Sequence, residues 1–128
     1  MTWILLIVVA IGVIGLLLLV RRRKRLSAAA SSKIRSAWNH AVSLPDTHRR
    51  LLEADKVLDV TLEELGYRGT LGEKLKKASG SIPSVNAVWA AHKMRNRIAH
   101  EPGASLSDAE CRSALQAFER AIFAFLRS

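Results

Sequence analysis

Residues 85 to 103 read VNAVWAAHKMRNRIAHEPG, and the organisation of the chain can be worked out from this stretch. Its apolar side chains recur at spacings of three and four residues, which places them on one face of a helix. Those side chains are Ala87, Ala91, Met94 and Ile98. The Pro102-Gly103 pair predicts where the helix ends, because neither residue continues a helix readily. A helix with one apolar face needs partners, and the flanking segments must provide them.

Four further segments carry the same helical spacing. They run from about Ile34 to Pro45, from Asp46 to Leu65, from the Thr70 cap through a short lysine-rich stretch, and from Ser107 to Leu126. No segment alternates as a half-buried strand does, so the sequence predicts an all-α fold, a small four- to five-helix bundle over residues 27–128. Whether residues 26–33 form a linker or continue a helix is left open by their small side chains.

Helix ends can also be located from the sequence. Thr70 and Ser107 are each followed three residues later by a glutamate, which is the pattern of a capping box. Ser84 is placed to cap the helix that begins at Val85. Gly66 follows the long second helix where a C-terminal glycine is favoured.

The N-terminus differs from the rest of the chain. Trp3 to Val20 is an apolar run of 18 residues without a charged side chain, and as a helix it would rise roughly 27 Å. We therefore expect a single transmembrane helix within an anchor at residues 1–26, contacting the bilayer through residues 3–20. A cleaved signal peptide is the alternative, but its positive charge would precede the apolar run, whereas Arg21–Arg25 follows it.

The basic cluster Arg21–Arg25 bears on orientation and partners. Short basic flanks stay on the cytoplasmic side, so we expect the N-terminus outside the cell (inner) membrane and the C-terminal domain in the cytoplasm. The cluster would meet anionic lipid headgroups. It holds five of the 20 basic residues, which leaves 15 against 11 acidic ones, so the remaining domain is only mildly basic. The single cysteine, Cys111, excludes an intrachain disulfide and fits a reducing compartment.

Two charged sites stand out within the predicted bundle. Asp55 projects between Leu51 and Leu62 on the apolar face of its helix, so its carboxylate should be at least partly buried. It either stays solvated at the rim or meets Arg95 or a histidine. The lysines of the short third helix, Lys74, Lys76 and Lys77, are expected to form a solvated face, with contact to RNA phosphates as the alternative.

The helix at residues 85–103 carries the candidate site. Arg95 projects toward the buried side, whereas Lys93 and Arg97 lie opposite and fit ordinary surface charges. His92 and Asn96 project onto the neighbouring strip, at the border of the core. His100 lies about 140° around the axis from Arg95 on an unbroken helix, so both can reach one ligand only if the helix distorts or a second copy contributes.

The stretch RNRIAH at residues 95–100 resembles the motif of HEPN domains: an arginine, a polar residue and a histidine after four intervening positions. The trailing His-Glu-Pro and the leucine-rich second helix are similar to prokaryotic members. The resemblance covers roughly residues 32 to 128 and implies a four- or five-helix bundle. Many HEPN proteins are metal-independent ribonucleases that act as homodimers, often in bacterial defence, stress or toxin roles.

The resemblance assigns roles to individual residues. Arg95 would bind the scissile phosphate, Asn96 would help to orient it, and His100 would act as general acid or base. Asp55 and His92 are supporting candidates, and we expect Asp55 to orient Arg95 by a charge-assisted hydrogen bond. No cofactor or metal is implied, and the four histidines fall in no recognised ligand spacing. Two alternatives stay open: a catalytically silent module that binds nucleotide, RNA or a protein partner, and a purely structural role in helix packing.

Overall fold

The computed structural model describes residues 1–20 and 25–127, and the side chains of residues 19 and 20 lie outside this description. Over these residues the chain forms helices and no strand, which confirms the all-α prediction. The elements are α1 (Thr2–Val20), α2 (Ala28–Ser43), α3 (Thr47–Glu64), α4 (Leu71–Ala78), the 3-10 turn η1 (Ser79–Ser81), α5 (Val85–His100) and α6 (Asp108–Leu126).

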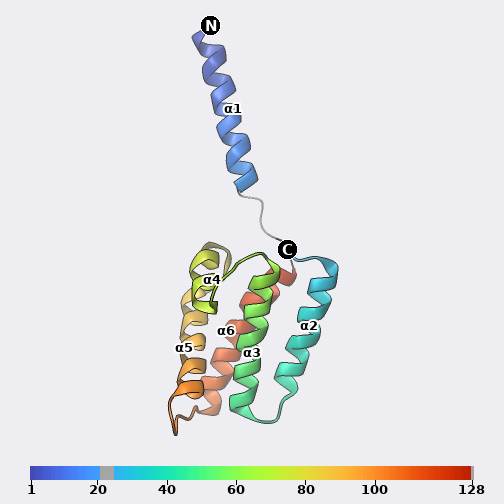
Figure 1. Cartoon of the computed structure of the whole chain (residues 1–128), viewed down its shortest axis with the longest axis vertical. Coiled ribbons are helices and arrows are strands. Elements are labelled where there is room, and N and C mark those ends of the chain that lie inside the picture. Colours follow the sequence, from blue (N-terminus) through green and yellow to red (C-terminus); the bar gives the residue numbers. More distant parts are fainter. Residues whose placement is uncertain (21–24, 128) are drawn as a thin grey trace.

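Helix α1 stands apart from the bundle formed by the other helices, and its apolar side chains are exposed, Trp3 at 79% (Figure 1). No helix in the described part of the chain is long and apolar enough to span a membrane.

The prediction of a transmembrane anchor at residues 1–26 is therefore wrong. The predictions that depended on it, a single-pass protein of the cell inner membrane with a cytoplasmic C-terminal domain, are wrong for the same reason. The basic cluster assigned to lipid headgroups falls at residues 21–25, of which 21–24 lie outside the described residues. Arg25 is described and exposed.

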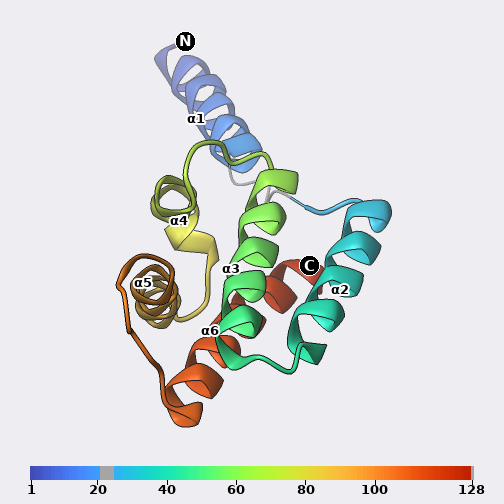
Figure 2. The same cartoon turned by 60° about the horizontal axis from the view of Figure 1, so that its bottom comes forward.

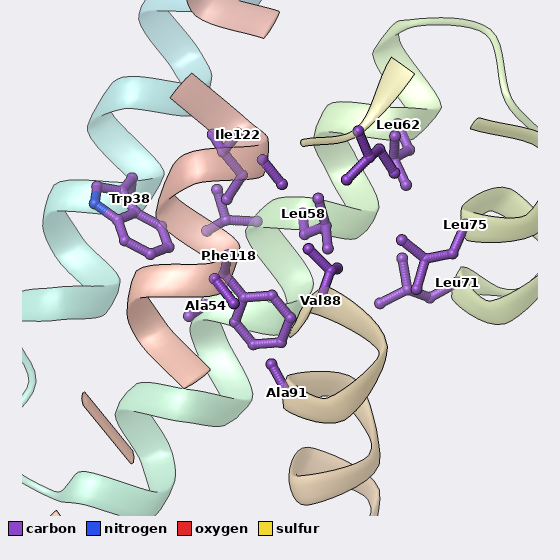
Figure 3. Close-up of a cluster of buried hydrophobic side chains, with 14 of the residues drawn as sticks. Trp38, Ala54, Leu58, Leu62, Leu71, Leu75, Val88, Ala91, Phe118 and Ile122 are labelled. Carbon is purple, nitrogen blue, oxygen red and sulfur yellow. The ribbon is translucent and has the colours of Figure 1, made fainter. Parts of the chain in front are cut away.

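Helix α3 is the centre of the bundle. It packs against α2, α4, α5 and α6, and α5 packs in turn against α6 (Figures 1 and 2). Figure 3 shows the core between these helices, where Leu58 of α3 and Phe118 of α6 are fully buried beside Val88 of α5. Trp38 of α2 is also buried, and its ring meets that of Phe123 edge-on, with centroids 6.3 Å apart.

The start of α2 shows which of residues 26–33 belong to a helix and which to a linker. Ser27 has an extended backbone, and its side-chain oxygen accepts a hydrogen bond from the Ala30 N–H at 3.1 Å, so the helix begins at Ala28. The predicted end near Pro45 is confirmed, because the helix stops at Ser43. Asp46 then caps α3 by accepting from the Arg49 N–H at 2.6 Å.

Two of the three predicted serine and threonine caps are present. Thr70 Oγ1 accepts from the Glu73 N–H at 3.2 Å, and Ser107 Oγ accepts from the Glu110 N–H at 3.1 Å. Ser84 makes no such bond, so that prediction is wrong. Its backbone is left-handed, with φ of 52°, whereas a capping side chain needs the extended backbone that the other two residues have.

Lys76 and Lys77 are exposed, as predicted for a solvated lysine face, but Lys74 is buried. Its side chain is only 4% exposed, and its ammonium lies 2.9 Å from Asp59 of α3 and also pairs with Glu63. Lys74 shares the buried face of α4 with Leu71 and Leu75, so its stem is held against α3. Although desolvation opposes the charged form, hydrogen bonds to Glu63 and Asp59 raise the pKa of Lys74.

A candidate site between α3 and α5

The buried face of α5 brings Arg95 to α3. Val88 and Ala91 are buried against the core, and Arg95 follows Ala91 by one helical turn. Its guanidinium therefore faces α3 at the border of the core, and its side chain is 24% exposed. On α3, Asp55 lies one turn from Leu51 on the same apolar face, which buries its carboxylate as the helical projection predicts.

Four side chains form a closed circuit of polar contacts, which we call the polar ring: Asp55, His92, Arg95 and Asn96. Asp55 Oδ1 lies 2.9 Å from His92 Nδ1, and His92 Nε2 lies 3.4 Å from Asn96 Nδ2. Arg95 Nη1 donates to Asn96 Oδ1 at 3.2 Å, and Arg95 Nε lies 3.2 Å from Asp55 Oδ2. Asp55 therefore meets both Arg95 and a histidine, the two partners that the sequence offered as alternatives to a solvated rim position.

The contacts of the polar ring determine which ring nitrogen carries the proton when His92 is neutral. Asp55 can only accept, so the proton of a neutral imidazole lies on Nδ1. Nε2 is then an acceptor, and the Asn96 amide N–H points toward it. This arrangement turns Asn96 Oδ1 to Arg95, consistent with the bond from Nη1. The Trp89 ring, edge-on to the imidazole with centroids 6.2 Å apart, packs beside His92.

The Asp55–Arg95 contact differs from the expected charge-assisted hydrogen bond. Arg95 Nε is close enough to Asp55 for an ion pair but is buried without an aligned hydrogen-bond acceptor. The hydrogen bond of Asp55 goes to His92 instead. Of the five guanidinium N–H groups, one is thus directed at Asn96 Oδ1. Arg95 retains donors for a ligand.

The polar ring opens into a shallow depression of about 430 Å³, the ring depression. Its wall includes the turn that opens α4, where Gly69 has φ of +110° and Thr70 caps the helix. The lining residues are Asp55, Lys56, Asp59, Gly69, Thr70, Leu71, Gly72, His92, Arg95 and Asn96.

A second depression, of about 470 Å³, lies at the C-terminal end of α5 and is here called the His100 depression. It is lined by Lys93, Met94, Asn96, Arg97, His100 and Glu101. Its basic side chains outnumber its single carboxylate, and Arg97 is only loosely paired with Glu110 at 3.6 Å. Asn96 lines both depressions, so the two meet at this residue.

The structure does not bring Arg95 and His100 together within one chain. Helix α5 continues to His100, the Glu101 N–H bonds to the Arg97 carbonyl at 2.9 Å, and no distortion occurs between the two side chains. Arg95 accordingly lines the ring depression, whereas His100 is exposed and lines the other. The sequence analysis required either a distorted helix or a second copy for Arg95 and His100 to reach one ligand. The structure excludes the distorted helix.

Sequence reasoning missed part of the ring depression. Asp59 was not singled out, although it lies one turn beyond Asp55 on α3, and the spacing of four residues is the signal that could have found it. Thr70 and Gly72 were treated only as a cap and a turn. Among the described residues, no three His, Cys, Asp or Glu side chains converge in a way that could hold a metal ion.

Comparisons of this chain with protein-family models, with curated proteins and with solved structures found no match.

Proposed function

We propose that this chain is a HEPN-like ribonuclease domain that acts as a homodimer and cleaves RNA without a metal ion. The observation that carries the proposal is the position of Asn96, which borders the Arg95 side and the His100 side of α5 at once. A phosphodiester chain bound at Arg95 can continue across Asn96 along the basic lining of the His100 depression, while the His100 that acts at Arg95 comes from the second copy. The basic lining of the His100 depression supports binding of a polyanion.

The chemistry needs only groups that the chain provides. Arg95 binds the scissile phosphate through its remaining N–H groups, and Asn96 helps to orient it. Neutral His100 takes the proton from the RNA 2′-hydroxyl, whose oxygen attacks the adjacent phosphorus while the bond to the 5′-oxygen breaks. Protonated His100 of the second copy, or water, gives a proton to the departing 5′-oxygen. The products are a 2′,3′-cyclic phosphate and a 5′-hydroxyl.

A homodimer resolves the separation of Arg95 and His100. In a two-fold dimer the same surface meets itself, so the α5 face of one copy can place its His100 opposite Arg95 of the other. The exposed position of His100 leaves it accessible to such a partner.

The test is cleavage of RNA by the purified full-length chain in excess EDTA, with the products analysed for 2′,3′-cyclic phosphate ends. His100→Ala should reduce the rate roughly 100-fold or more, the usual contribution of a general acid or base. His40→Ala is the matched control, because His40 is an exposed histidine near the end of α2. Unchanged cleavage in His100→Ala, or cleavage only with a divalent metal, would refute the mechanism.

A second candidate function is a catalytically silent module that binds nucleotide, RNA or a protein partner through the polar ring. It is favoured by the separation of Arg95 from His100 within one chain, because a binding site needs only the ring depression. Binding without turnover, lost in a folded Arg95→Ala variant and retained in His100→Ala, would support this function over the first.

A further inference from the structure

His92 can carry a proton on one ring nitrogen or on both, and its contacts with Asp55 and Asn96 make the arrangement of the polar ring depend on which form is present. We propose that His92 is a positioning residue: when it takes up a second proton, the Asn96 amide turns over and releases Arg95 to bind a phosphodiester. The inference rests on the proposed function only in its choice of ligand. It concerns binding at the ring depression, and no step of it requires cleavage.

With neutral His92 the ring is internally satisfied. Asp55 accepts from Nδ1, Nε2 accepts from the Asn96 amide, and Asn96 Oδ1 accepts from Arg95 Nη1. The formal charges of Asp55 and Arg95 cancel. One N–H of the Arg95 guanidinium is directed at Asn96 and cannot donate to a ligand. The ring with neutral His92 is therefore less suited to binding a phosphate than the ring with protonated His92.

Protonation reverses the contact between His92 and Asn96. Nε2 becomes a donor, and at 3.4 Å it would face the N–H groups of Asn96 Nδ2, an unfavourable pairing of two donors. The imidazole does not turn away instead, because its Nδ1–H is held by Asp55 at 2.9 Å. Rotation of the Asn96 amide by half a turn removes the clash and brings Oδ1 to Nε2–H.

The rotated amide then presents its N–H groups to Arg95. Two donors again face each other, now at the 3.2 Å separation of Arg95 Nη1 and the Asn96 side chain. The guanidinium loses its acceptor, so the Nη1 N–H becomes available to a ligand in the ring depression, which Arg95 lines. The net charge of the ring also rises from zero to +1, and both changes favour a phosphate.

The contact of His92 Nε2 among the described side chains is Asn96 Nδ2. The charged groups that line the same depression are Asp55, Lys56 and Asp59 of α3 and Arg95 of α5. Lys56 is paired with Glu53 at 2.9 Å, and Asp59 Oδ1 with Lys74 at 2.9 Å. Residues 69–72, at the turn before α4 and its first two positions, contribute no charged side chain, and the Glu73 carboxylate lies beside Gly69. Because Asn96 contacts Nε2, its amide is the group that rearranges when Nε2 takes up a proton.

The switch is tested first by NMR on the full-length chain, in a mild detergent because α1 exposes apolar side chains. The His92 ring and the Asn96 side-chain amide are followed from about pH 5 to about pH 8, the range in which histidine titrates. We expect the Asn96 amide to shift with the same midpoint as His92. An Asn96 amide that stays constant through the His92 titration would overturn the proposal.

Binding is tested with a 2′-O-methyl RNA oligonucleotide, which lacks the hydroxyl nucleophile and whose diester charge is constant over this pH range. Affinity for wild type should rise about fivefold or more between about pH 8 and about pH 5.5, the scale of typical coupling between sites. His92→Asn keeps an N–H donor for Asp55 but takes no second proton, so it should lose this dependence. His40→Asn should retain it, because His40 is an exposed histidine on α2, outside the polar ring.

The outcomes separate this inference from the ribonuclease proposal. Proton-linked binding without cleavage of unmodified RNA refutes the ribonuclease and supports the switch. Cleavage with pH-independent binding, a His92→Asn variant with undiminished pH dependence, or no binding at any pH, overturns the switch. Circular dichroism of each variant verifies that it is folded.

Discussion

Arg95 of α5 and Asp55 of α3 form an ion pair in which Nε lies 3.2 Å from Oδ2 and the carboxylate side chain is only 6% exposed. A second arginine on the same helix provides the contrast. Arg97 lies 3.6 Å from Glu110 of α6, with side chains 44% and 47% exposed. Burial therefore distinguishes two ion pairs two residues apart, and it decides which of them stabilises the packing of α5.

Asp55→Ala should lower the free energy of unfolding by about 2–3 kcal/mol. This is less than the loss at a fully buried pair, because part of the Arg95 side chain reaches solvent, but it leaves the Arg95 charge without its ion-pair partner and His92 Nδ1 without its acceptor. Arg97→Ala is the matched control and should cost about 0.5 kcal/mol or less. Urea unfolding measures both, and equal losses in the two variants would contradict the assignment.

A shared dimer site makes a prediction about mixtures. Arg95→Ala and His100→Ala should each be inactive alone, but mixing the two should restore about a quarter of the wild-type rate. Random exchange puts half of the chains in mixed two-fold dimers, and each mixed dimer has one intact pair of Arg95 and His100. The measurement is RNA cleavage after co-refolding. A mixture as inactive as its components would place both residues of each site on one chain.

Lys74 predicts how stability depends on pH. Its pKa is raised in the folded chain, so its contribution is present below the unfolded value of about 10.4 and is lost as the pH rises through the folded value. The hydrogen bond from Lys74 lowers the pKa of Glu63, whose contribution is present above about 4.3 and is lost as the pH falls. Thermal unfolding between about pH 3 and pH 11 should show both losses.

The matched variants at this position are Lys74→Met and Lys74→Ala. Lys74→Met keeps the buried stem without the charge, so it should change the free energy of unfolding near pH 7 by about 1 kcal/mol or less and weaken both losses. Lys74→Ala also removes packing against α3 and should cost roughly 2 kcal/mol. If Lys74→Met were as destabilising as Lys74→Ala, the ion pairs with Asp59 and Glu63 would matter more than the stem.

Two serines at helix starts should respond to substitution with opposite signs. Ser84→Gly should stabilise the chain by roughly 0.5–1 kcal/mol, because glycine adopts the left-handed backbone at φ of 52° without strain and no capping bond is lost. Ser107→Ala removes the acceptor of the Glu110 N–H and should cost about 1 kcal/mol. Thermal unfolding gives both values. Destabilisation by Ser84→Gly would show that its side chain has a role at the start of α5.

Helical periodicity was sufficient to place most of the bundle and the burial of Asp55. Asp55 was predicted at the core from its projection between two leucines, and it is buried there. Lys74 was missed although the same rule applies, since it lies three residues after Leu71 and shares its face. The assumption that lysines are solvated outweighed the spacing. Only the positions of Asp59 and Glu63, on another helix, explain why a lysine is tolerated inside.

Other features depend on information that spacing does not contain. The left-handed backbone of Ser84 is set by how the turn after η1 meets α5, which no residue type in the stretch signals. The angular separation of Arg95 and His100 was predicted, but whether the helix ended early could be decided only from its hydrogen bonds. At the N-terminus, hydropathy alone led to a membrane span that the described helix does not support.

In the proposed ribonuclease, the placement of Asn96 between the two depressions would set a minimum length for the RNA. A mononucleotide would occupy one depression or the other, whereas a dinucleotide would be the shortest RNA with a phosphate beside Arg95 and a nucleotide continuing past Asn96 into the His100 depression. The position of the Asn96 side chain on α5 would then make the protein select RNA by its length. This selection would need no contact with the bases.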